Sequence, residues 1–548
     1  MNRVEDPSRC TFESVIELSG MTNGPVRDSI RVDLRRCARL LGVVLFGLAV
    51  QTCVTRPSLR PVEGGAAVAT GHAKLHLWDG RLLVVEGYRV VGDDVTGVGV
   101  AYDPDRVLVG QGSFTVPIRA IALVETSELI ADPRMATLAV VTAASLVATA
   151  ACIMNPKACF GSCPTFYVPG GGGWHLQAEG FSSSIARSLA AEDTDALVDA
   201  RPVDGTIVVA MRNEALETHV VQGLRLLVVD GPADSTVLLT HDNRFAALGR
   251  TVPPRECAGS PDTCDLLSER DGREFKPQSD GHDLASRDEL VLRFDAPGNR
   301  EVGVVVMLRN SLMSTFVLYH LIALQGSHYG DFLAAIERRD LAVLAAVNGF
   351  ERTLGPVEVA IRQRDEAWRA VGEIPYIGPI ALGVRVVPAR VEHADEAYEV
   401  RLRYARAHWR FEAVRAGSLM ARDLVAREVA ASVQVSGRFD ARMVSDQMRG
   451  RGAGLVMQPG DEVRFRFMVP QSAGSQAYFL RSRGYYYEWM RREWLREENV
   501  PLASALLADP ATALRTLAPQ FRVVEPRMDA VFEASRYTRQ TPPSSVAP

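Results

Sequence analysis

The sequence predicts a mainly β protein with helical insertions: a small β sheet or barrel domain, then one or two β-sandwich-like domains, and a C-terminal aromatic helix. Short stretches of alternating apolar and polar residues recur along most of the chain, separated by Gly- and Asp-rich turns. Residues 135–154 and 311–324 are instead uncharged and do not alternate. Because one domain usually has about 100–200 residues, we expect the 548 residues to form several folded units.

The composition is that of a folded globular protein. Hydrophobic residues make up 47% of the chain and charged residues 23%. The net charge of −5 gives no overall electrostatic reason to bind a polyanion. We therefore expect no nucleic-acid partner.

Residues 1–53 have the pattern of a signal or anchor segment. Arg31, Arg35, Arg36 and Arg39 precede the apolar, uncharged residues 40–50. A basic region followed by a short apolar stretch is typical of export signals, and this stretch is short for a hydrocarbon core of about 30 Å. We expect a protein of the cell envelope, attached to the membrane through its N-terminal segment, with its body in the periplasm.

The fate of this segment has three readings. The small residues Gly47 and Ala49 fit cleavage by an ordinary signal peptidase. Cys53 is a lipidation candidate, although residues 50–52 (VQT) depart from the usual Leu-(Ala/Ser)-(Gly/Ala) run. The third reading is an uncleaved anchor or a buried helix.

The N-terminal half of the body divides at composition changes. Residues 54–71 are rich in Pro, Gly and Ala and predict a tether, and residues 72–133 predict the small β domain. Residues 134–155 predict an apolar, alanine-rich helix that either spans the membrane or lies buried or at an interface. Residues 156–310 predict a β-sandwich-like domain. Within it, Gly170 to Gly173 predict a hairpin turn and not a phosphate-binding loop, because no helix pattern follows.

The C-terminal half also alternates between helical and β-rich segments. Residues 311–354 predict a helical segment, residues 355–482 a second β-sandwich-like domain, and residues 483–540 a helical region. In that region Tyr487, Met490 and Trp494 would share one helix face. We expect residues 541–548 to be a disordered tail.

Four cysteines have informative spacing. Cys159 and Cys163 flank a Phe-Gly-Ser segment, and Cys257 and Cys264 flank a polar loop. Both pairs are candidates for short disulfide loops in an oxidising compartment. The alternatives are free thiols or a zinc site with four thiolates, but the spacing differs from that of zinc motifs.

Familiar catalytic motifs are missing from the sequence, including the P-loop, HExxH and G-x-S-x-G. Weaker candidates for metal binding or proton transfer remain: Glu214, Glu217 and His219 in one cluster, and Asp280, His282 and Asp283 in another. On a strand, Glu217 and His219 would share a face and Glu214 would not. Ser182 to Ser184 contain possible nucleophiles, but we expect them to cap a helix. The sequence assigns no catalytic residue, cofactor or metal.

Several segments together resemble a known group of proteins. These segments are residues 158–168 (ACFGSCPTFYV), 174–189 (WHLQAEGFSSSIARSL), 212–219 (RNEALETH) and 482–495 (SRGYYYEWMRREWL). They are similar to uncharacterised predicted lipoproteins of Gram-negative bacteria, in which a small β domain and an apolar segment precede a Ser-Cys-Pro motif. The resemblance covers most of residues 70–500 and implies an envelope location and this architecture. It implies no catalytic residues.

We therefore expect an envelope-anchored, non-enzymatic protein with a binding or structural role, and an envelope protein or glycan as its partner. The alternative is an envelope hydrolase with a site assembled from several strands.

Overall fold

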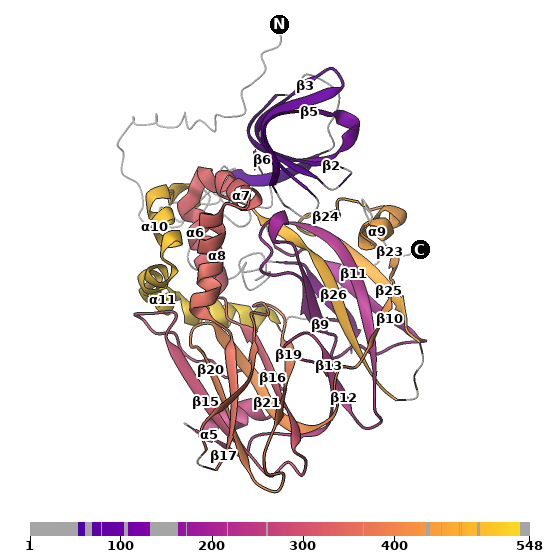
Figure 1. The fold of residues 1–548 in the computed structure, drawn as a ribbon, viewed down its shortest axis with the longest axis vertical. Helices are drawn as coiled ribbons and strands as arrows, with labels where there is room; N and C mark the ends of the chain where they lie inside the picture. The colour runs from indigo at the N-terminus through magenta and orange to yellow at the C-terminus, as the bar shows by residue number, and fades with distance from the viewer. Residues whose placement is uncertain are drawn as a thin grey trace, which may run out of the picture. The chain divides into compact units, whose positions relative to one another are not determined.

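A computed structural model describes the chain between residues 53 and 536, with gaps. The described residues are 53–60, 68–77, 79, 81–103, 108–131, 163–170, 173–215, 217–258, 261–364, 366–434, 439–450, 452–470, 472, 474–489 and 494–536. Antiparallel sheets with helical insertions dominate, as the sequence predicts (Figure 1).

The N-terminal part is a six-stranded antiparallel sheet that curves strongly (Figure 1). Its order is β1-β6-β2-β3-β4-β5, from β1 (Cys53–Arg60), β2 (Val68–Leu77), β3 (Leu82–Val91), β4 (Asp94–Tyr102), β5 (Leu108–Pro117) and β6 (Ile121–Ala131). Alternate residues such as Leu75, Leu83 and Val85 form its core. Residues 54–60 fall in the predicted tether, but they belong to β1, which pairs with β6 and extends the sheet.

Two five-stranded sheets form a first sandwich. One has the order β23-β25-β10-β7-β8, and the other has the order β22-β11-β26-β9 with β24 paired to β11. Leu226 and Leu480 of one sheet pack on Phe166, Met211 and Phe465 of the other. The strands are β7 (Thr165–Gly170), β8 (Gly173–Glu179), β9 (Ala191–Ala196), β10 (Thr206–Arg212), β11 (Glu217–Gly231), β22 (Ala426–Val429), β23 (Ser432–Gln434), β24 (Leu455–Met457), β25 (Glu462–Met468) and β26 (Ser475–Glu488).

A second sandwich has sheets of order β12-β13-β21-β16-β19 and β14-β15-β20-β17-β18. Val304 and Phe411 of the first sheet pack on Leu292, Val359 and Leu402 of the second. The strands are β12 (Thr236–Leu239), β13 (Phe245–Val252), β14 (Glu256–Cys257), β15 (Arg287–Phe294), β16 (Glu301–Asn310), β17 (Val357–Gln363), β18 (Arg369–Ile374), β19 (Gly383–Arg390), β20 (Tyr398–Ala405) and β21 (Trp409–Ala421).

The strands of the two sandwiches do not follow the predicted division into residues 156–310 and 355–482. Residues 165–231 pair with residues 426–488 in the first sandwich, and the second sandwich is built from the intervening residues 236–421. Alternation shows that a segment has a buried face, but it does not show which distant strand covers that face. The second sandwich is therefore an insertion in the first.

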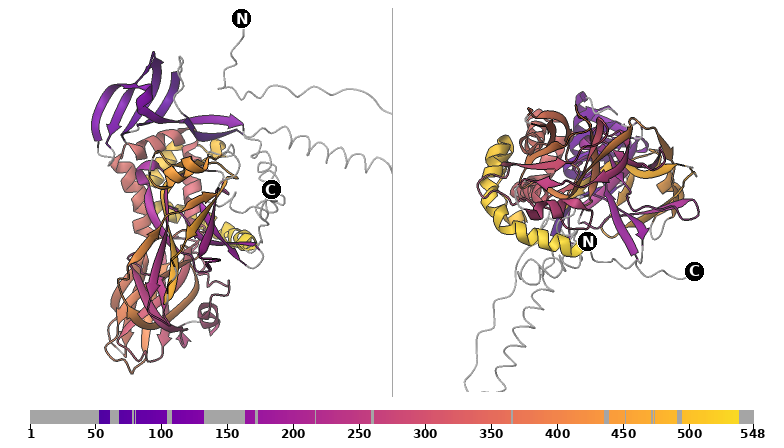
Figure 2. Two further views of the ribbon diagram at one scale, coloured as in Figure 1. Left: turned by 90° about the vertical axis from the view of Figure 1, so that its right-hand side faces the viewer. Right: turned by 90° about the horizontal axis from the view of Figure 1, so that it is seen from below.

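The predicted helical segment at residues 311–354 is confirmed. It contains α6 (Met313–Gln325), α7 (Tyr329–Glu337) and α8 (Leu341–Leu354). Asp340 caps α8 by accepting hydrogen bonds from the backbone N–H groups of Ala342 and Val343. Further helices are α5 (Pro261–Ser268), α9 (Ala441–Met448), α10 (Val500–Ala508) and α11 (Pro510–Arg536). Figure 2 shows that α11 is bent, and it contains Pro519 and Pro526.

The prediction of an aromatic helix from residue 483 is wrong in its first part. Tyr485, Tyr486 and Tyr487 belong to β26, which pairs with β11 from Gly231–Ser475 to Glu217–Glu488. Tyrosine suits strands as well as helices, and the long pairing with β11 outweighs the local helical spacing. Among the described residues, a 3-10 turn lies at Trp494–Arg496, and α-helix begins after Asn499, which caps α10 by accepting from the N–H of Leu502.

Several expectations lie outside the described residues: the signal segment 1–52, the side chain of Cys53, the apolar segment 134–155 and the tail 541–548. Within the described part of the chain, every helix is too short or too polar to cross a bilayer.

Candidate functional site

Several sequence candidates belong to a group of mostly buried polar side chains in the first sandwich, and one member of this group, Glu179, reaches the loop of residues 375–382, which joins β18 to β19. We call this group the acid–thiol cluster. It consists of Cys163, Glu179, Asp193, Asp195, Glu217 and His219. Strand alternation places Glu217 and His219 on one face of β11, as predicted.

Short contacts connect one half of the acid–thiol cluster. Nε2 of His219 and Oε2 of Glu217 are hydrogen-bonded at 3.0 Å. The same carboxylate oxygen accepts a hydrogen bond from the backbone N–H of Cys163 at 3.0 Å. The Cys163 thiol donates to Oε2 of Glu179, with a sulfur–oxygen distance of 3.4 Å. Cys163 therefore bridges the two glutamates.

Glu179 also fixes the loop between β18 and β19. The backbone N–H of Ile380 donates to Oε1 and Oε2 of Glu179 at 3.2 and 3.1 Å. Asn310 holds the same loop by accepting from the N–H groups of Ile377 and Gly378 at 2.9 and 3.0 Å. The loop belongs to the second sandwich, so Glu179 is a junction between the two sandwiches.

Asp195 makes a second connection between the sandwiches. Its Oδ2 accepts from the backbone N–H of Glu179 at 3.3 Å, and its Oδ1 lies 3.6 Å from the guanidinium of Arg385 on β19. Arg385 also donates to the backbone carbonyl of Thr194 at 3.2 Å. The polar groups therefore connect β8, β9 and β19.

Burial favours the uncharged forms of most groups in the acid–thiol cluster. Burial, and then the nearby Glu179 and Glu217, hold the pKa of the Cys163 thiol well above its usual range. Burial and Asp195 do the same to the pKa of Glu179. Burial, with Asp193 beside it, raises the pKa of Asp195 to about 7. Burial lowers the pKa of His219 to about 3, so its contact with Glu217 is a hydrogen bond of a neutral imidazole.

The protonation states of Cys163 and His219 do not suit catalysis. Nucleophilic cysteines react as thiolates, and a general base needs a pKa near the working pH. Cys163 is 3% exposed and Glu179 is 2% exposed, while Glu217 and His219 are fully buried. A substrate would have to displace the residues that cover these side chains to reach them.

The other sequence candidates are dispersed. Glu214 accepts from the hydroxyls of Thr165 and Tyr167 at 2.9 and 2.5 Å. Asp280 accepts from the N–H of His282 and Asp283 from that of Ala285, as in ordinary polar turns. Among the described residues, no set of three His, Cys, Asp or Glu side chains is arranged to hold a metal ion.

The serine run does not cap a helix, so that prediction is wrong. The helical turn that follows is only the 3-10 segment Arg187–Leu189, which has Ala186 at its N-cap and no side-chain cap. Ser184 is fully buried, and the backbone carbonyl of Ser182 accepts from the hydroxyl of Tyr486 at 3.1 Å. A nucleophilic serine needs an accessible hydroxyl next to a general base, and the side chains of Ser182 and Ser184 are both buried.

The cysteine predictions have different outcomes. Cys257 and Cys264 form a disulfide with an S–S distance of 2.05 Å. Cys163 is a free, buried thiol, which differs from the predicted bridge to Cys159. Cys159 itself lies outside the described residues. The thiol of Cys163 is directed to Glu179, a partner that cysteine spacing alone cannot indicate.

A second buried network was missed by sequence reasoning. The ammonium of Lys74 on β2 donates to Glu125 at 2.8 Å, to Glu337 of α7 at 3.2 Å and to the Tyr487 hydroxyl at 3.3 Å. Burial alone would lower the pKa of Lys74, but Glu125 and Glu337 outweigh it and raise this pKa. Lys74 and His76 are both buried, and the Lys74 ammonium contacts α7 and β26. This network fastens the N-terminal sheet to the rest of the body.

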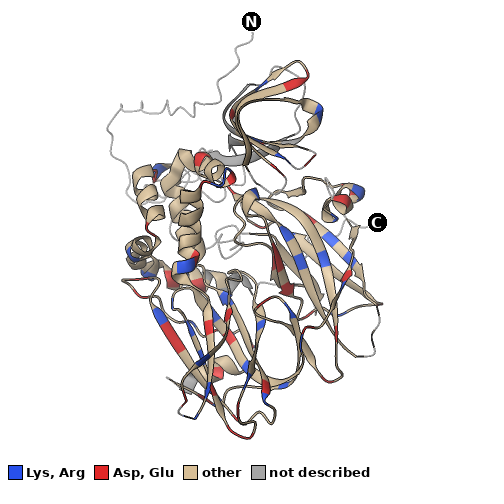
Figure 3. Cartoon of the chain, viewed as in Figure 1, with Lys and Arg blue, Asp and Glu red and all other residues tan. Residues whose placement is uncertain are grey.

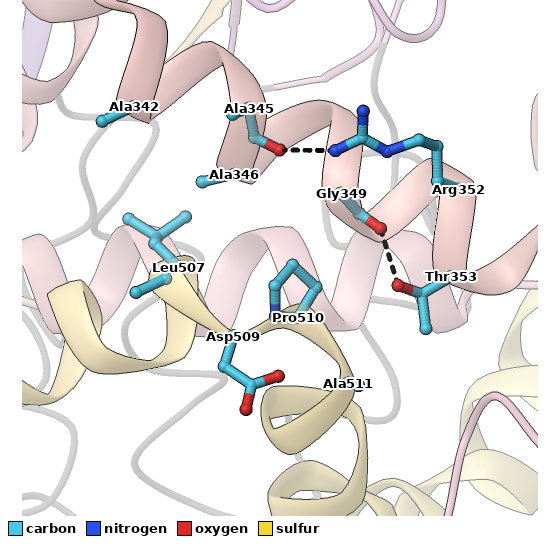
Figure 4. A pocket seen from close by; sticks show the side chains of 11 residues that line it. Ala342, Ala345, Ala346, Gly349, Arg352, Thr353, Leu507, Asp509, Pro510 and Ala511 are labelled. Atoms are coloured by element: carbon cyan, nitrogen blue, oxygen red, sulfur yellow. Dashed lines mark hydrogen bonds between the residues drawn. The ribbon is translucent and has the colours of Figure 1, made fainter.

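A solvent-accessible groove lies away from the acid–thiol cluster. The groove in Figure 4 has a volume of about 610 Å³ and runs between α8 and the junction of α10 with α11. Small residues such as Ala346, Gly349 and Ala511 line it. Its polar groups are already engaged, since Thr353 donates to the carbonyl of Gly349 at 2.7 Å and Asp509 accepts from Thr512 at 2.7 Å. The groove could accommodate a ligand, but its lining residues do not form a pair of a nucleophile and a general base.

Comparison with known proteins adds little. No family model matches the chain, and no curated protein matches it. A weak structural similarity is to the single-particle cryo-EM structure of the arabinofuranosyltransferase AftD from Mycobacteria, at 10% identity and a TM-score of 0.10. The aligned region covers 89% of this chain and 42% of that chain. A TM-score this low carries no argument about the fold or the function.

Proposed function

We propose that this chain is a non-enzymatic binding or structural protein of the cell envelope, anchored through its N-terminal segment with its body in the periplasm. The observation that carries the proposal is the closed acid–thiol cluster. The groups that most resemble catalytic residues bond to one another, and one of them, Glu179, also joins the two sandwiches. Such groups stabilise an interface and do not turn over a substrate.

The disulfide between Cys257 and Cys264 supports the location outside the cytosol. Disulfides persist in oxidising compartments such as the periplasm and are rare in the cytosol. The serial β sandwiches also agree with a binding role, because their faces and edges present broad surfaces for an envelope protein or a glycan.

The location is tested by protease treatment of spheroplasts from cells that express the full chain. We expect the body to be degraded only after the outer membrane is removed, while the inner membrane remains intact. Mass spectrometry of the same sample should find Cys257 and Cys264 oxidised. Protection of the body until the inner membrane is lysed would refute the envelope location.

The non-enzymatic role is tested with the purified full chain on chromogenic esters, amides and glycosides. We expect no turnover above that of a Cys163→Ala/His219→Gln double variant. Turnover that this double variant abolishes, with its folding verified by circular dichroism, would favour the alternative, an envelope hydrolase. In parallel, cross-linking in cells should join the same envelope component to the wild-type chain and to the double variant.

A further inference from the structure

The first sandwich has a pocket lined by arginines, which we call the arginine pocket. Its volume is about 260 Å³, and it lies where β11 and β26 meet the residues that follow α9. Figure 3 shows basic residues in blue along β11 and β26. The charged residues that line the pocket are Arg225, Arg449, Arg481, Arg483, Glu192 and Glu428.

The strand register brings three of these arginines to one face of the sheet. Arg225 of β11 is directly opposite Arg481 of β26, and Gly223 is opposite Arg483. Because side chains two residues apart share a face, Arg481 and Arg483 point the same way. Like charges that face each other across a strand pair destabilise the sheet. Glu428, which pairs with Arg481, and Glu192, which is opposite Arg483 on β9, offset part of this repulsion, and a bound anion would offset more of it.

Two of the four guanidinium groups are already engaged. Arg481 donates to Glu428 at 3.4 Å, and Arg225 donates to the backbone carbonyls of Leu224 and Met448. The side chains of Arg449 and Arg483 are exposed and have no ion pair or hydrogen bond to any residue that the structure describes. Four arginines and two glutamates leave the pocket with a net charge of +2.

We propose that the arginine pocket binds the phosphate monoester group of a small phosphorylated molecule, such as a sugar phosphate or glycerol phosphate. A phosphate monoester carries a charge of about −1.5 to −2 at pH 7, which matches the pocket. Each guanidinium presents a planar pair of donors to two phosphate oxygens. Since one water occupies about 30 Å³ in the liquid, the pocket has room for the phosphate and a small organic group. The inference deepens the proposed function, and rests on it, by naming a ligand that is bound without turnover.

The proposal is tested by calorimetric titration of the purified full chain with inorganic phosphate, glycerol 3-phosphate and glucose 1-phosphate. We expect saturable binding of the monoesters. Loss of one charge-assisted contact should weaken it about tenfold in Arg449→Gln and in Arg483→Gln. Both arginines are exposed, so these variants should fold. The matched control is Arg427→Gln on β22, an exposed arginine that pairs with Asp230 at 2.7 Å, and it should bind like the wild type.

Several results would overturn the proposal. These are the absence of saturable binding, equal affinity in all variants, or equally tight binding of glucuronate, which would indicate a carboxylate ligand. Binding to phosphatidylglycerol vesicles without binding of the soluble monoesters would also overturn it, in favour of a membrane surface. Release of inorganic phosphate from a bound monoester would support the ligand class and refute the non-enzymatic role. If the chain neither binds nor hydrolyses the monoesters, only the proposed ligand class is refuted, and the non-enzymatic role stands.

Discussion

The carboxyl group of Glu179 occupies the space that a β-carbon at Gly378 would fill. Gly378 has a φ of +109°, a conformation that other residues rarely adopt. Two separate requirements, the backbone angle and the close approach of Glu179, therefore call for glycine at this point in the junction between the sandwiches.

Replacement of Gly378 by alanine tests this junction. We expect Gly378→Ala to lower the free energy of unfolding by about 2–4 kcal/mol, because strain in φ adds to the displacement of Glu179. The matched control is Gly298→Ala, whose φ of +68° is strained but whose β-carbon would meet no atom within 4 Å. It should cost only about 1–2 kcal/mol. Equal losses in urea denaturation would contradict a role for the contact with Glu179.

The raised pKa of Asp195 predicts a pH dependence of stability. Burial and the neighbouring Asp193 raise the pKa of Asp195 from 3.8 to about 7 in the folded protein. The folded state then binds more protons than the unfolded state between these values, so this group's contribution to stability falls as pH rises from 4 to 7.

The measurement is the difference in free energy of unfolding between the wild type and Asp195→Asn. We expect Asp195→Asn to become more stable relative to the wild type as pH rises from 4 to 7. Asp79→Asn is the control, because hydrogen bonding by Arg81 lowers the pKa of Asp79 and any effect falls below pH 4. A difference for Asp195→Asn that stays constant from pH 4 to 7 would refute the prediction.

His219 predicts the opposite slope. Burial lowers its pKa from 6.5 to about 3, so the unfolded chain binds a proton that the folded chain does not. The contribution of His219 is complete above pH 6.5 and is lost progressively as pH falls toward 3. His219→Gln should therefore become more stable relative to the wild type with acidification, as measured by thermal unfolding across this range. A parallel pH profile for the two proteins would argue against a neutral buried imidazole.

Local sequence signals were sufficient for several elements of the fold. Gly170 and Gly173 close the hairpin of β7 and β8, because glycine-rich turns between two alternating stretches have few other solutions. The apolar residues 311–324 predicted a buried helical segment, and Leu321 and Leu324 of α6 are indeed buried. Within the candidate site, the pairing of Glu217 with His219 followed from the two-residue period of a strand.

Contacts between residues that are distant in the sequence could not be predicted from these local patterns. Glu179 contacts Ile380, which is 201 residues away in the chain, and no spacing rule links them. Lys74 and His76 alternate with apolar residues as a solvated face would, yet both are buried, and Lys74 contacts α7 and β26. The spacing of Tyr487 with Met490 and Trp494 fits a helix face, but Tyr485 to Tyr487 pair with β11 as part of a strand. In each case the deciding contact came from a distant segment.

The buried ion pair of Arg309 and Glu274 gives a final prediction about how the C-terminal helix is held. Nε and Nη2 of Arg309 each donate to Glu274 at 2.7 Å, and the two side chains are 0% and 1% exposed. The guanidinium also lies 4.1 Å from the ring of Phe532 on α11. Removing one partner leaves a buried charge unpaired, so Arg309→Met should cost about 3–5 kcal/mol.

The exposed pair of Arg81 and Asp79 is the matched control. Its N–O distance is also 2.7 Å, but both side chains are 52% exposed. Arg81→Met should therefore cost less than about 1 kcal/mol. The double variant Arg309→Met/Glu274→Leu should recover much of the loss, because neither charge then remains buried alone. Equal costs for Arg309→Met and Arg81→Met in chemical denaturation would show that burial does not govern the strength of these pairs. A double variant with fully additive losses would show that Arg309 acts mainly through Phe532 and the backbone carbonyls of Asn310 and Pro379, which it also contacts.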